Sequence, residues 1–385
     1  MLNDFIERIR AASADGTPLR IRGGGSKDFY GEPVQGQLLD TRALTGVMSY
    51  EPSELVVTVR AGTPLAELEA VLAQQNQCLP FEPPHFAWQG EGAVATVGGM
   101  VAAGLSGPAR ASVGCVRDYV LGAGLINGRG EHLQFGGQVM KNVAGYDVSR
   151  VLAGSLGTLG LITELSLKVL PLAPAEATLE FTCTQVEALD LLNTWGGQPL
   201  PLNASAWIAE AAPADAPEGA ARQGVLWLRL RGAVAAVESA CRGLGGTLRL
   251  PEQAQPVWTA LRDQRLPFFI DAVPRGLALW RVSVPQTAPV LALPGQPLVE
   301  WHGGLRWYAL AVDQADAVRA AARAVGGHAT LFIAPSSAAE ATPPRFDALS
   351  APLARIHDGL RRSFDPAGIF NPGRQYTVQA TGAMA

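Results

Sequence analysis

Three clusters of small residues before Leu161 have the composition of anion-binding loops. Gly23-Gly24-Gly25-Ser26 directly follows the alternating strand-like run Leu19–Arg22, and the other two clusters are Thr96–Gly107 and Gly154–Gly160. Glycine reaches backbone angles that are closed to other residues, so successive N–H groups in such loops can point into one concavity. Each N–H bonded to a charged oxygen contributes roughly 1.5–3 kcal/mol, so three or four would hold a pyrophosphate. Any single cluster also fits a plain tight turn, but three together favour a shared ligand.

Strand-like and helix-like patterns alternate around these clusters and predict the elements that position them. Glu54–Gly62 is typical of a strand, and Thr63–Leu72 is typical of a helix with Pro64 at its first position. Leu161–Val169 alternates apolar and polar residues like a half-buried strand, and Val120–Gly130 predicts a strand followed by an Asn-Gly hairpin.

Length and composition indicate an enzyme of two or three domains. The chain has 385 residues, of which 48% are hydrophobic, and 43 glycines and 28 prolines favour a loop-rich fold. A net charge of -4 without a basic run argues against nucleic acid as a partner. The N-terminal residues 1–10 read as an amphipathic helix and not as a signal peptide, and no run of 18 apolar residues occurs. We therefore expect a cytoplasmic protein.

Cysteine and histidine spacing predicts neither an iron-sulfur cluster nor a metal site on this chain. The cysteines are tens of residues apart, whereas cluster ligands are usually closely grouped. The histidines are scattered without ligand spacing. The residues concerned are Cys78, Cys115, Cys183, Cys241, His85, His132, His302, His328 and His357.

Four motifs in a fixed order resemble those of the FAD-binding oxidoreductases of the PCMH type, the vanillyl-alcohol oxidase superfamily. They are RGGGS, then TVGGMVAAGLSGPARASVGCVRDYVLG, then KNVAGYD followed by GSLGTLGLIT, and finally FDPAGIFNPGR. Within this superfamily the sequence resembles the group of FAD-binding E subunits of bacterial glycolate oxidases. The resemblance covers residues 15–172 and 355–374 well, and it is thin between them.

The resemblance implies an α+β fold with three parts. A PCMH-type FAD-binding domain of two α+β subdomains would span residues 1–172. An α+β cap domain with an antiparallel sheet would span 173–345, and a C-terminal segment, 346–385, would return to the FAD domain. Strand-like runs that alternate with helix-like stretches at 233–243, 252–263 and 313–325 agree with such a cap.

The loops and the resemblance together predict a site for non-covalent FAD. Ser26 and Lys27 stand where relatives that link the flavin covalently have a histidine, and Leu156 replaces a glutamate that is common in the GSLGTLG motif. The predicted cofactor-binding residues are Arg22, Gly23, Gly24, Gly25, Ser26, Pro84, Thr96, Val97, Gly98, Gly99, Gly104, Ser106, Gly107, Gly114, Gly157, Gly160, Ile162 and Asn371.

Arg306 and His302 in the predicted cap are the candidate catalytic residues. An arginine beside a flavin can bind a substrate carboxylate through two parallel hydrogen bonds, and a histidine can take the hydroxyl proton during hydride transfer. Both residues also fit ordinary structural roles, Arg306 on a strand face and His302 in a turn. The histidine-rich segment and the Glu-His pair with which related hydroxyacid dehydrogenases hold a metal are missing.

Three functions remain open from the sequence. The first is an FAD-binding subunit of a glycolate or 2-hydroxyacid dehydrogenase complex, which would oxidise glycolate to glyoxylate with a larger FAD-binding catalytic subunit and an iron-sulfur subunit as partners. The second is a self-sufficient FAD oxidase or dehydrogenase of a small hydroxyacid or polyol. The third is a non-catalytic flavoprotein scaffold. The first would associate with a membrane at most peripherally, through its partners.

Overall fold

The chain forms two compact units in a computed structural model that describes residues 2–87, 92–137, 147–210, 222–335 and 342–376. The first unit contains residues 1–105, Cys115–Pro171 and 348–385. The second contains Leu172–Asp347 and the short segment Ser106–Gly114, which the sequence prediction places in the first domain. The predicted domain borders stay a prediction. Residues 141–146 of the KNVAGYD motif lie outside the described residues.

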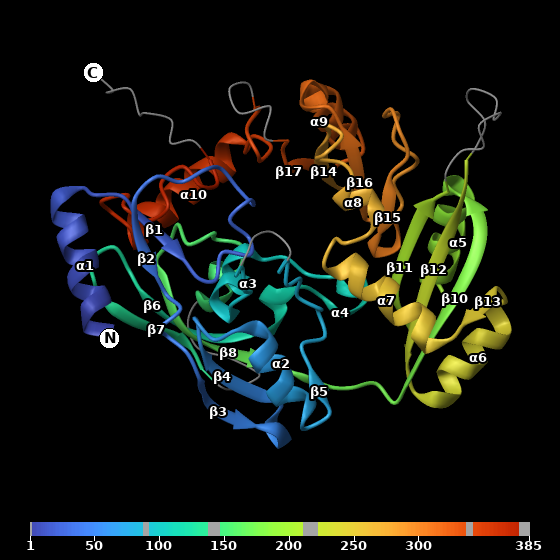
Figure 1. The fold of residues 1–385 in the computed structure, drawn as a ribbon, viewed down its shortest axis with the longest axis horizontal. Helices are drawn as coiled ribbons and strands as arrows, with labels where there is room; N and C mark the ends of the chain where they lie inside the picture. The colour runs from blue at the N-terminus through green and yellow to red at the C-terminus, as the bar shows by residue number, and fades with distance from the viewer. Residues whose placement is uncertain (1, 88–91, 138–146, 211–221, 336–341, 377–385) are drawn as a thin grey trace. The chain divides into compact units, whose positions relative to one another are not determined.

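A five-stranded antiparallel sheet in the order β3-β4-β8-β6-β7 is the centre of the first unit (Figure 1). Every residue of β6 is buried, because this strand is paired on both edges and contacts apolar residues on its faces. The strands are β3 (Val47–Glu51), β4 (Val56–Arg60), β6 (Val120–Ile126), β7 (His132–Gly136) and β8 (Leu161–Lys168). The predicted strands at 54–62 and 161–169 are thus confirmed.

The remaining elements of this unit hold the glycine clusters beside the sheet. Helix α3 packs on β4 and β8, and β1 pairs in parallel with β2. Leu19 of β1 also forms a parallel bridge with Phe370, so a segment far along the chain lies beside β1. The elements are α1 (Leu2–Asp15), β1 (Leu19–Arg22), β2 (Gln37–Asp40), η1 (Pro52–Glu54), α2 (Leu65–Ala73), β5 (Gln77–Cys78), α3 (Val97–Ala103), η2 (Val116–Tyr119), η3 (Ser149–Leu152), β9 (Leu170–Pro171) and α10 (Ala351–Phe364).

An eight-stranded antiparallel sheet in the order β13-β10-β12-β11-β15-β16-β14-β17 organises the second unit (Figure 1). Its strands are β10 (Ala175–Thr184), β11 (Leu202–Ala209), β12 (Gln223–Gly232), β13 (Thr247–Arg249), β14 (Ala278–Ser283), β15 (Leu298–Glu300), β16 (Leu305–Leu310) and β17 (His328–Ile333). Its helices and turns are α4 (Arg110–Val113), α5 (Gln185–Gly196), α6 (Val234–Leu244), α7 (Pro251–Arg262), α8 (Pro267–Ile270), η4 (Trp301–Gly303), η5 (Val312–Gln314) and α9 (Ala315–Ala324). The predicted α+β fold with an antiparallel sheet is confirmed.

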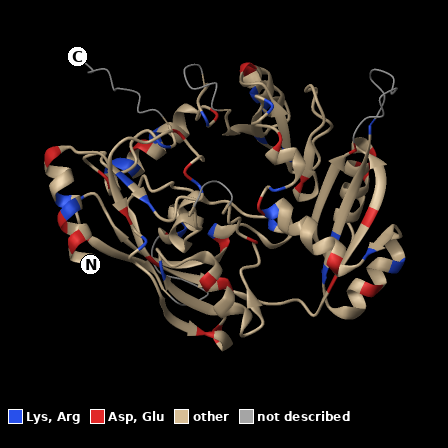
Figure 2. Ribbon diagram, in the orientation of Figure 1, with Lys and Arg blue, Asp and Glu red and all other residues tan. Residues whose placement is uncertain are grey.

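Two apolar cores stabilise the second unit, one at each half of its sheet. Helices α5 and α6 pack on β10 and β12 over a core that contains buried Trp195 and Trp207. Helix α9 packs on β14 and β17 over a core that contains Trp280 and Tyr308. Figure 2 shows basic and acidic residues interspersed along both units.

The connection between β6 and β7 is longer than its Asn-Gly dipeptide predicts. The N–H of Asn127 donates to the carbonyl of Glu131 at 3.1 Å, which closes a turn of several residues. The side-chain oxygen of Asn127 accepts from the N–H groups of Arg129 and Glu131 at 2.9 and 3.0 Å. Asn127 thus organises the loop through its side chain and not as the corner of a two-residue turn.

Candidate functional site

The three glycine clusters of the first unit meet at two neighbouring cavities of about 290 and 80 Å³. The residues that line both of them are Ile21, Gly23, Gly99, Ala102, Leu156 and Asn371. The first cavity is also lined by Arg20, Arg22, Gly24, Gly25, Ser26, Lys27, Asp28, Pro33, Val34, Val94, Thr96, Ala103 and Arg374. The second is also lined by Thr41, Ala61, Gly98, Gly157, Gly160 and Ile162. Segments from both ends of the sequence therefore form one recess.

Glycine is required in the first cluster because the loop lies directly against the segment before α3. A Cβ on Gly24 would lie 1.9 Å from the carbonyl oxygen of Val94, and one on Gly23 would lie 2.4 Å from Oγ1 of Thr96. The N–H of Val94 donates to the carbonyl of Gly24 at 3.0 Å, and Gly25 has a φ of 79°. The loop is thus fixed by main-chain contacts, and its backbone lines the cavity.

The second cluster caps the start of α3, and the third cluster packs against the end of this helix. At its start, Thr96 accepts a hydrogen bond from the N–H of Gly99 at 3.2 Å. At its end, a Cβ on Gly104 would lie 2.8 Å from Cα of Gly154. The N–H of Leu156 donates to the carbonyl of Ala102 at 2.8 Å. The Gly154–Gly160 turn is thereby held against α3.

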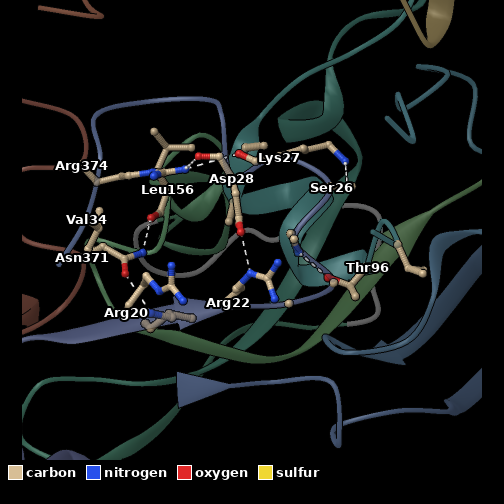
Figure 3. Close-up of a pocket in the computed structure, with 18 of the residues that line it drawn as sticks. Arg20, Arg22, Ser26, Lys27, Asp28, Val34, Thr96, Leu156, Asn371 and Arg374 are labelled. Atoms are coloured by element: carbon tan, nitrogen blue, oxygen red, sulfur yellow. Dashed lines mark hydrogen bonds and ion pairs between the residues drawn. The ribbon is translucent and has the colours of Figure 1, made fainter. Parts of the chain in front are cut away.

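Asn371 joins two walls of the recess (Figure 3). Its Nδ2 donates to the carbonyl of Leu156 at 2.7 Å, and its Oδ1 accepts from the N–H of Ile21 at 2.8 Å. Arg374 donates to the carbonyls of Asp28 and Glu32, both at 2.9 Å. The segment around residue 371 therefore fixes both the strand before the first cluster and the turn of the third.

The charges at the first cavity suit a diphosphate. Its lining residues include the basic side chains of Arg20, Arg22, Lys27 and Arg374, and Asp28 is the one acid among those described. Nε of Arg22 lies 2.6 Å from Oδ2 of Asp28 (Figure 3). Phosphate oxygens are bound where excess positive charge lies beside the main-chain N–H groups of glycines. The residues present therefore fit the pyrophosphate of FAD.

Twelve of the predicted cofactor-binding residues line at least one of the two cavities. Those that line a cavity are Arg22, Gly23, Gly24, Gly25, Ser26, Thr96, Gly98, Gly99, Gly157, Gly160, Ile162 and Asn371. Pro84, Val97 and Gly104 of the first unit line neither cavity, and Ser106, Gly107 and Gly114 belong to the second unit. All these contacts with the cofactor stay predictions.

Sequence reasoning missed two arginines at the first cavity, although both had a signal. Arg20 is two positions before Arg22 in β1, and residues two apart in a strand point to the same face. Arg374 closes the FNPGR motif. Because a pyrophosphate site needs positive charge, basic residues next to the predicted loops could have been included as candidates.

Arg306, a predicted catalytic residue, lies inside the second unit. Its side chain has an exposed fraction of 0%, and it donates hydrogen bonds to the carbonyls of Gly303, Pro289 and Ala288. Burial lowers the pKa of its guanidinium. The predicted contact with a substrate carboxylate stays a prediction, and these hydrogen bonds favour a structural role.

His302, the other predicted catalytic residue, is held in an unusual backbone conformation. Its φ is 54°, and its N–H donates to Oγ of Ser205 at 3.0 Å. Nε2 lies 3.0 Å from Oγ of Ser112, whereas Nδ1 is buried and has no hydrogen-bond partner. Burial lowers the pKa of this imidazole to about 4, so it is neutral at neutral pH. A neutral ring can share a hydrogen bond with the hydroxyl of Ser112 in either direction.

The described residues contain neither a cluster of metal-ligating side chains nor a helix that could span a membrane. No group of three or more His, Cys, Asp or Glu side chains within the described ranges could hold a metal ion. In the same part of the chain, no helix has the length and apolarity needed to cross a membrane.

Comparisons with known proteins agree with the fold. Residues 2–136 match a family described as FAD binding domain. Two solved structures of alkyldihydroxyacetonephosphate synthase are similar to the chain, with TM-scores of 0.65 and 0.61 at 16% and 15% identity. They cover 95% and 96% of this chain and 74% of each synthase chain. The fold is that of an FAD-binding oxidoreductase of the PCMH type, and FAD is its cofactor.

Longer sequence matches narrow this class. The chain is 45% identical over 372 residues to the glycolate oxidase subunit GlcE of Escherichia coli strain K12, which covers 97% of this chain and 96% of that protein. It is 30% identical over 179 residues to the glycolate oxidase subunit GlcD of Bacillus subtilis strain 168, which covers 46% of this chain and 37% of that protein. The chain belongs to the family of the glycolate oxidase subunit GlcE.

Proposed function

We infer that this chain is the FAD-binding subunit of a complex that oxidises glycolate, or a close 2-hydroxyacid, to glyoxylate. The observation that carries this inference is the match to GlcE, described as a subunit of glycolate oxidase, along 97% of the chain. A larger FAD-binding catalytic subunit and an iron-sulfur subunit complete the proposed complex, and the iron-sulfur subunit receives the electrons. The partial match to GlcD, also described as a glycolate oxidase subunit, supports a complex of related flavin chains.

The first unit supplies the binding chemistry for the cofactor. We assign the pyrophosphate to the main-chain N–H groups of Gly23–Ser26, with Arg22 and Lys27 compensating its charge at the same cavity. The second and third clusters supply glycines at the neighbouring cavity, which admits a ligand close to the backbone. Attachment is non-covalent, because Ser26 and Lys27 occupy the position of the linking histidine in flavinylated relatives. When bound, FAD supplies the acceptor for a hydride equivalent.

The decisive experiment compares this chain alone with the chain purified together with its partner subunits. Both preparations are examined for the flavin spectrum and for FAD released by denaturation, and both are assayed for glycolate-dependent dye reduction. We expect bound, acid-extractable FAD in both preparations. Turnover is expected in the complex and to be weak or absent in the lone chain.

Two results would overturn this assignment in different ways. Full turnover by the lone chain would make it a self-sufficient oxidase or dehydrogenase. An FAD-free chain inside a complex that oxidises glycolate would make it a scaffold, and it would also remove the cofactor from the cavity described above.

A further inference from the structure

Two neighbouring contacts join helix α4 to the η4 turn within the second unit. The guanidinium carbon of Arg110 lies 4.4 Å from the ring centroid of Trp301. One position further on in the turn, Nε2 of His302 lies 3.0 Å from Oγ of Ser112. Nε1 of Trp301 also donates to the carbonyl of Gly107 at 3.0 Å. The turn is therefore fixed against the segment that carries Arg110 and Ser112.

Arg110 retains its hydrogen-bonding capacity in this arrangement. Contact with the ring satisfies the face of a guanidinium and leaves the N–H donors at its edge available. Within the described residues, Arg110 has no hydrogen bond from its side chain and no ion pair, and it is partly exposed. Arg281 lies 5.0 Å from the centroid of the same indole ring and adds positive charge nearby. A partly exposed guanidinium of this kind is suited to binding a carboxylate.

Ser112 is a second polar group on the same short helix. It is exposed, and its hydroxyl lies 3.0 Å from Nε2 of the half-buried imidazole of His302. Trp301 and His302 both have positive φ, 55° and 54°. Two consecutive non-glycine residues in this conformation cost of order 1–3 kcal/mol each and are found mainly at functional sites. The turn thus holds a strained geometry that places the ring of His302 against Ser112.

We propose that Arg110 and Ser112 form a binding site for a small 2-hydroxycarboxylate anion, in which Arg110 binds the carboxylate and Ser112 hydrogen-bonds the hydroxyl. His302 is a positioning residue that orients the hydroxyl of Ser112. The choice of glycolate as the ligand rests on the proposed function, whereas the recognition of a carboxylate rests on Arg110 itself. Arg306, the arginine that the sequence brings forward for this role, has its donors occupied by carbonyl groups.

The test separates the two halves of the ligand by calorimetric titration of the full FAD-loaded chain. Glycolate carries both groups, acetate carries the carboxylate without the hydroxyl, and ethylene glycol carries hydroxyls without a carboxylate. We expect Arg110→Gln to weaken glycolate and acetate alike, by about tenfold or more, since a charge-assisted hydrogen bond is lost. Arg110→Lys should restore part of this affinity, because lysine keeps the charge but not the planar fork.

Changes at Ser112 and His302 should distinguish glycolate from acetate. Ser112→Ala is expected to weaken glycolate severalfold and to leave acetate unchanged, because acetate has no hydroxyl to lose a partner. His302→Asn, which keeps a residue type that tolerates positive φ, should show the same difference. Arg242→Gln on exposed α6 is the matched control and should change neither ligand.

The proposal is overturned if the wild-type chain binds no glycolate, if Arg110→Gln binds it like the wild type, or if Ser112→Ala weakens both acids equally. Glycolate oxidation by the whole complex is measured on the same preparations. An active complex with unchanged binding in the variants rejects this site and leaves the proposed function intact. An inactive complex whose chain still binds glycolate through Arg110 rejects the function and leaves the site.

Discussion

Replacement of Asn371 tests whether the recess in the first unit depends on its cross-link. Asn371→Ala removes the acceptor of the Ile21 N–H and the donor to the Leu156 carbonyl, which are 2.8 and 2.7 Å away. The two partners are half-buried, so the loss costs about 1–1.5 kcal/mol for each hydrogen bond. Asn371 also has a φ of 40°, where alanine adds roughly 1 kcal/mol of strain. The total is about 3–4 kcal/mol.

The cost should appear mainly as weaker FAD binding, because both hydrogen bonds fix cavity walls. If about 3 kcal/mol falls on binding, the dissociation constant rises by roughly a hundredfold. The measurement is titration of the deflavinated chain with FAD, followed by flavin fluorescence. Asn371→Gly removes the same hydrogen bonds without the strain, so the two variants should differ by roughly 1 kcal/mol.

Asn203→Ala is the matched control for this experiment. Asn203 is a buried asparagine of the second unit that accepts from Arg229 at 2.7 Å. Its loss should lower stability without changing the affinity for FAD. Wild-type affinity for FAD in Asn371→Ala would refute the reasoning, and so would an equal loss of affinity in Asn203→Ala.

Three further outcomes are expected. Asp28→Asn should tighten FAD binding severalfold in the same titration. The substitution neutralises the one acid that lines the first cavity and so removes roughly 1 kcal/mol of repulsion between its carboxylate and the phosphates. Weaker binding would contradict this. Gly98→Ala should destabilise the fold by about 1–3 kcal/mol, since its Cβ would lie 2.7 Å from Cβ of Ala61. Gly359→Ala in α10, with no atom near its Cβ, should instead raise the melting temperature, and equal melting shifts would count against the steric argument. The pKa of His302 is lowered to about 4 from 6.5. Its contribution of about 3 kcal/mol to the free energy of unfolding is therefore present above pH 6.5 and is lost as the pH falls towards 4. Denaturant titrations across this range should show a smaller loss for His302→Asn than for the wild type.

Local patterns in the sequence were sufficient to predict several of the elements around the glycine clusters. Leu161–Val169 alternates with the period of a strand, and the structure has β8 at Leu161–Lys168. At Gly24 any side chain would collide with a neighbouring carbonyl. The glycine in the sequence therefore already indicates that the backbone is closely approached there. Such features depend on neighbours in the sequence or on backbone freedom, so they are visible without a structure.

The partners of individual side chains could not be predicted in this way. Oδ1 of Asn371 accepts from a residue 350 positions away, and Ser112 and His302 are 190 positions apart. Arg306 is of a residue type that can bind a substrate carboxylate, but strand pairing places it on a covered face of the sheet. Only the packed fold decides whether a polar side chain contacts a ligand or a carbonyl.

The bond between Ile21 and Asn371 has a consequence for biosynthesis. Ile21 lies in the strand that precedes the first glycine cluster. The ribosome synthesises Asn371, whose side chain accepts a hydrogen bond from this strand, 350 residues later. The whole of Leu172–Asp347 is made in the interval. We therefore expect a nascent chain to have a recess that lacks one wall, and to retain flavin firmly only after translation has passed residue 371. Firm FAD binding should therefore require a chain that extends past residue 371, so fragments that end before this residue should lack bound flavin.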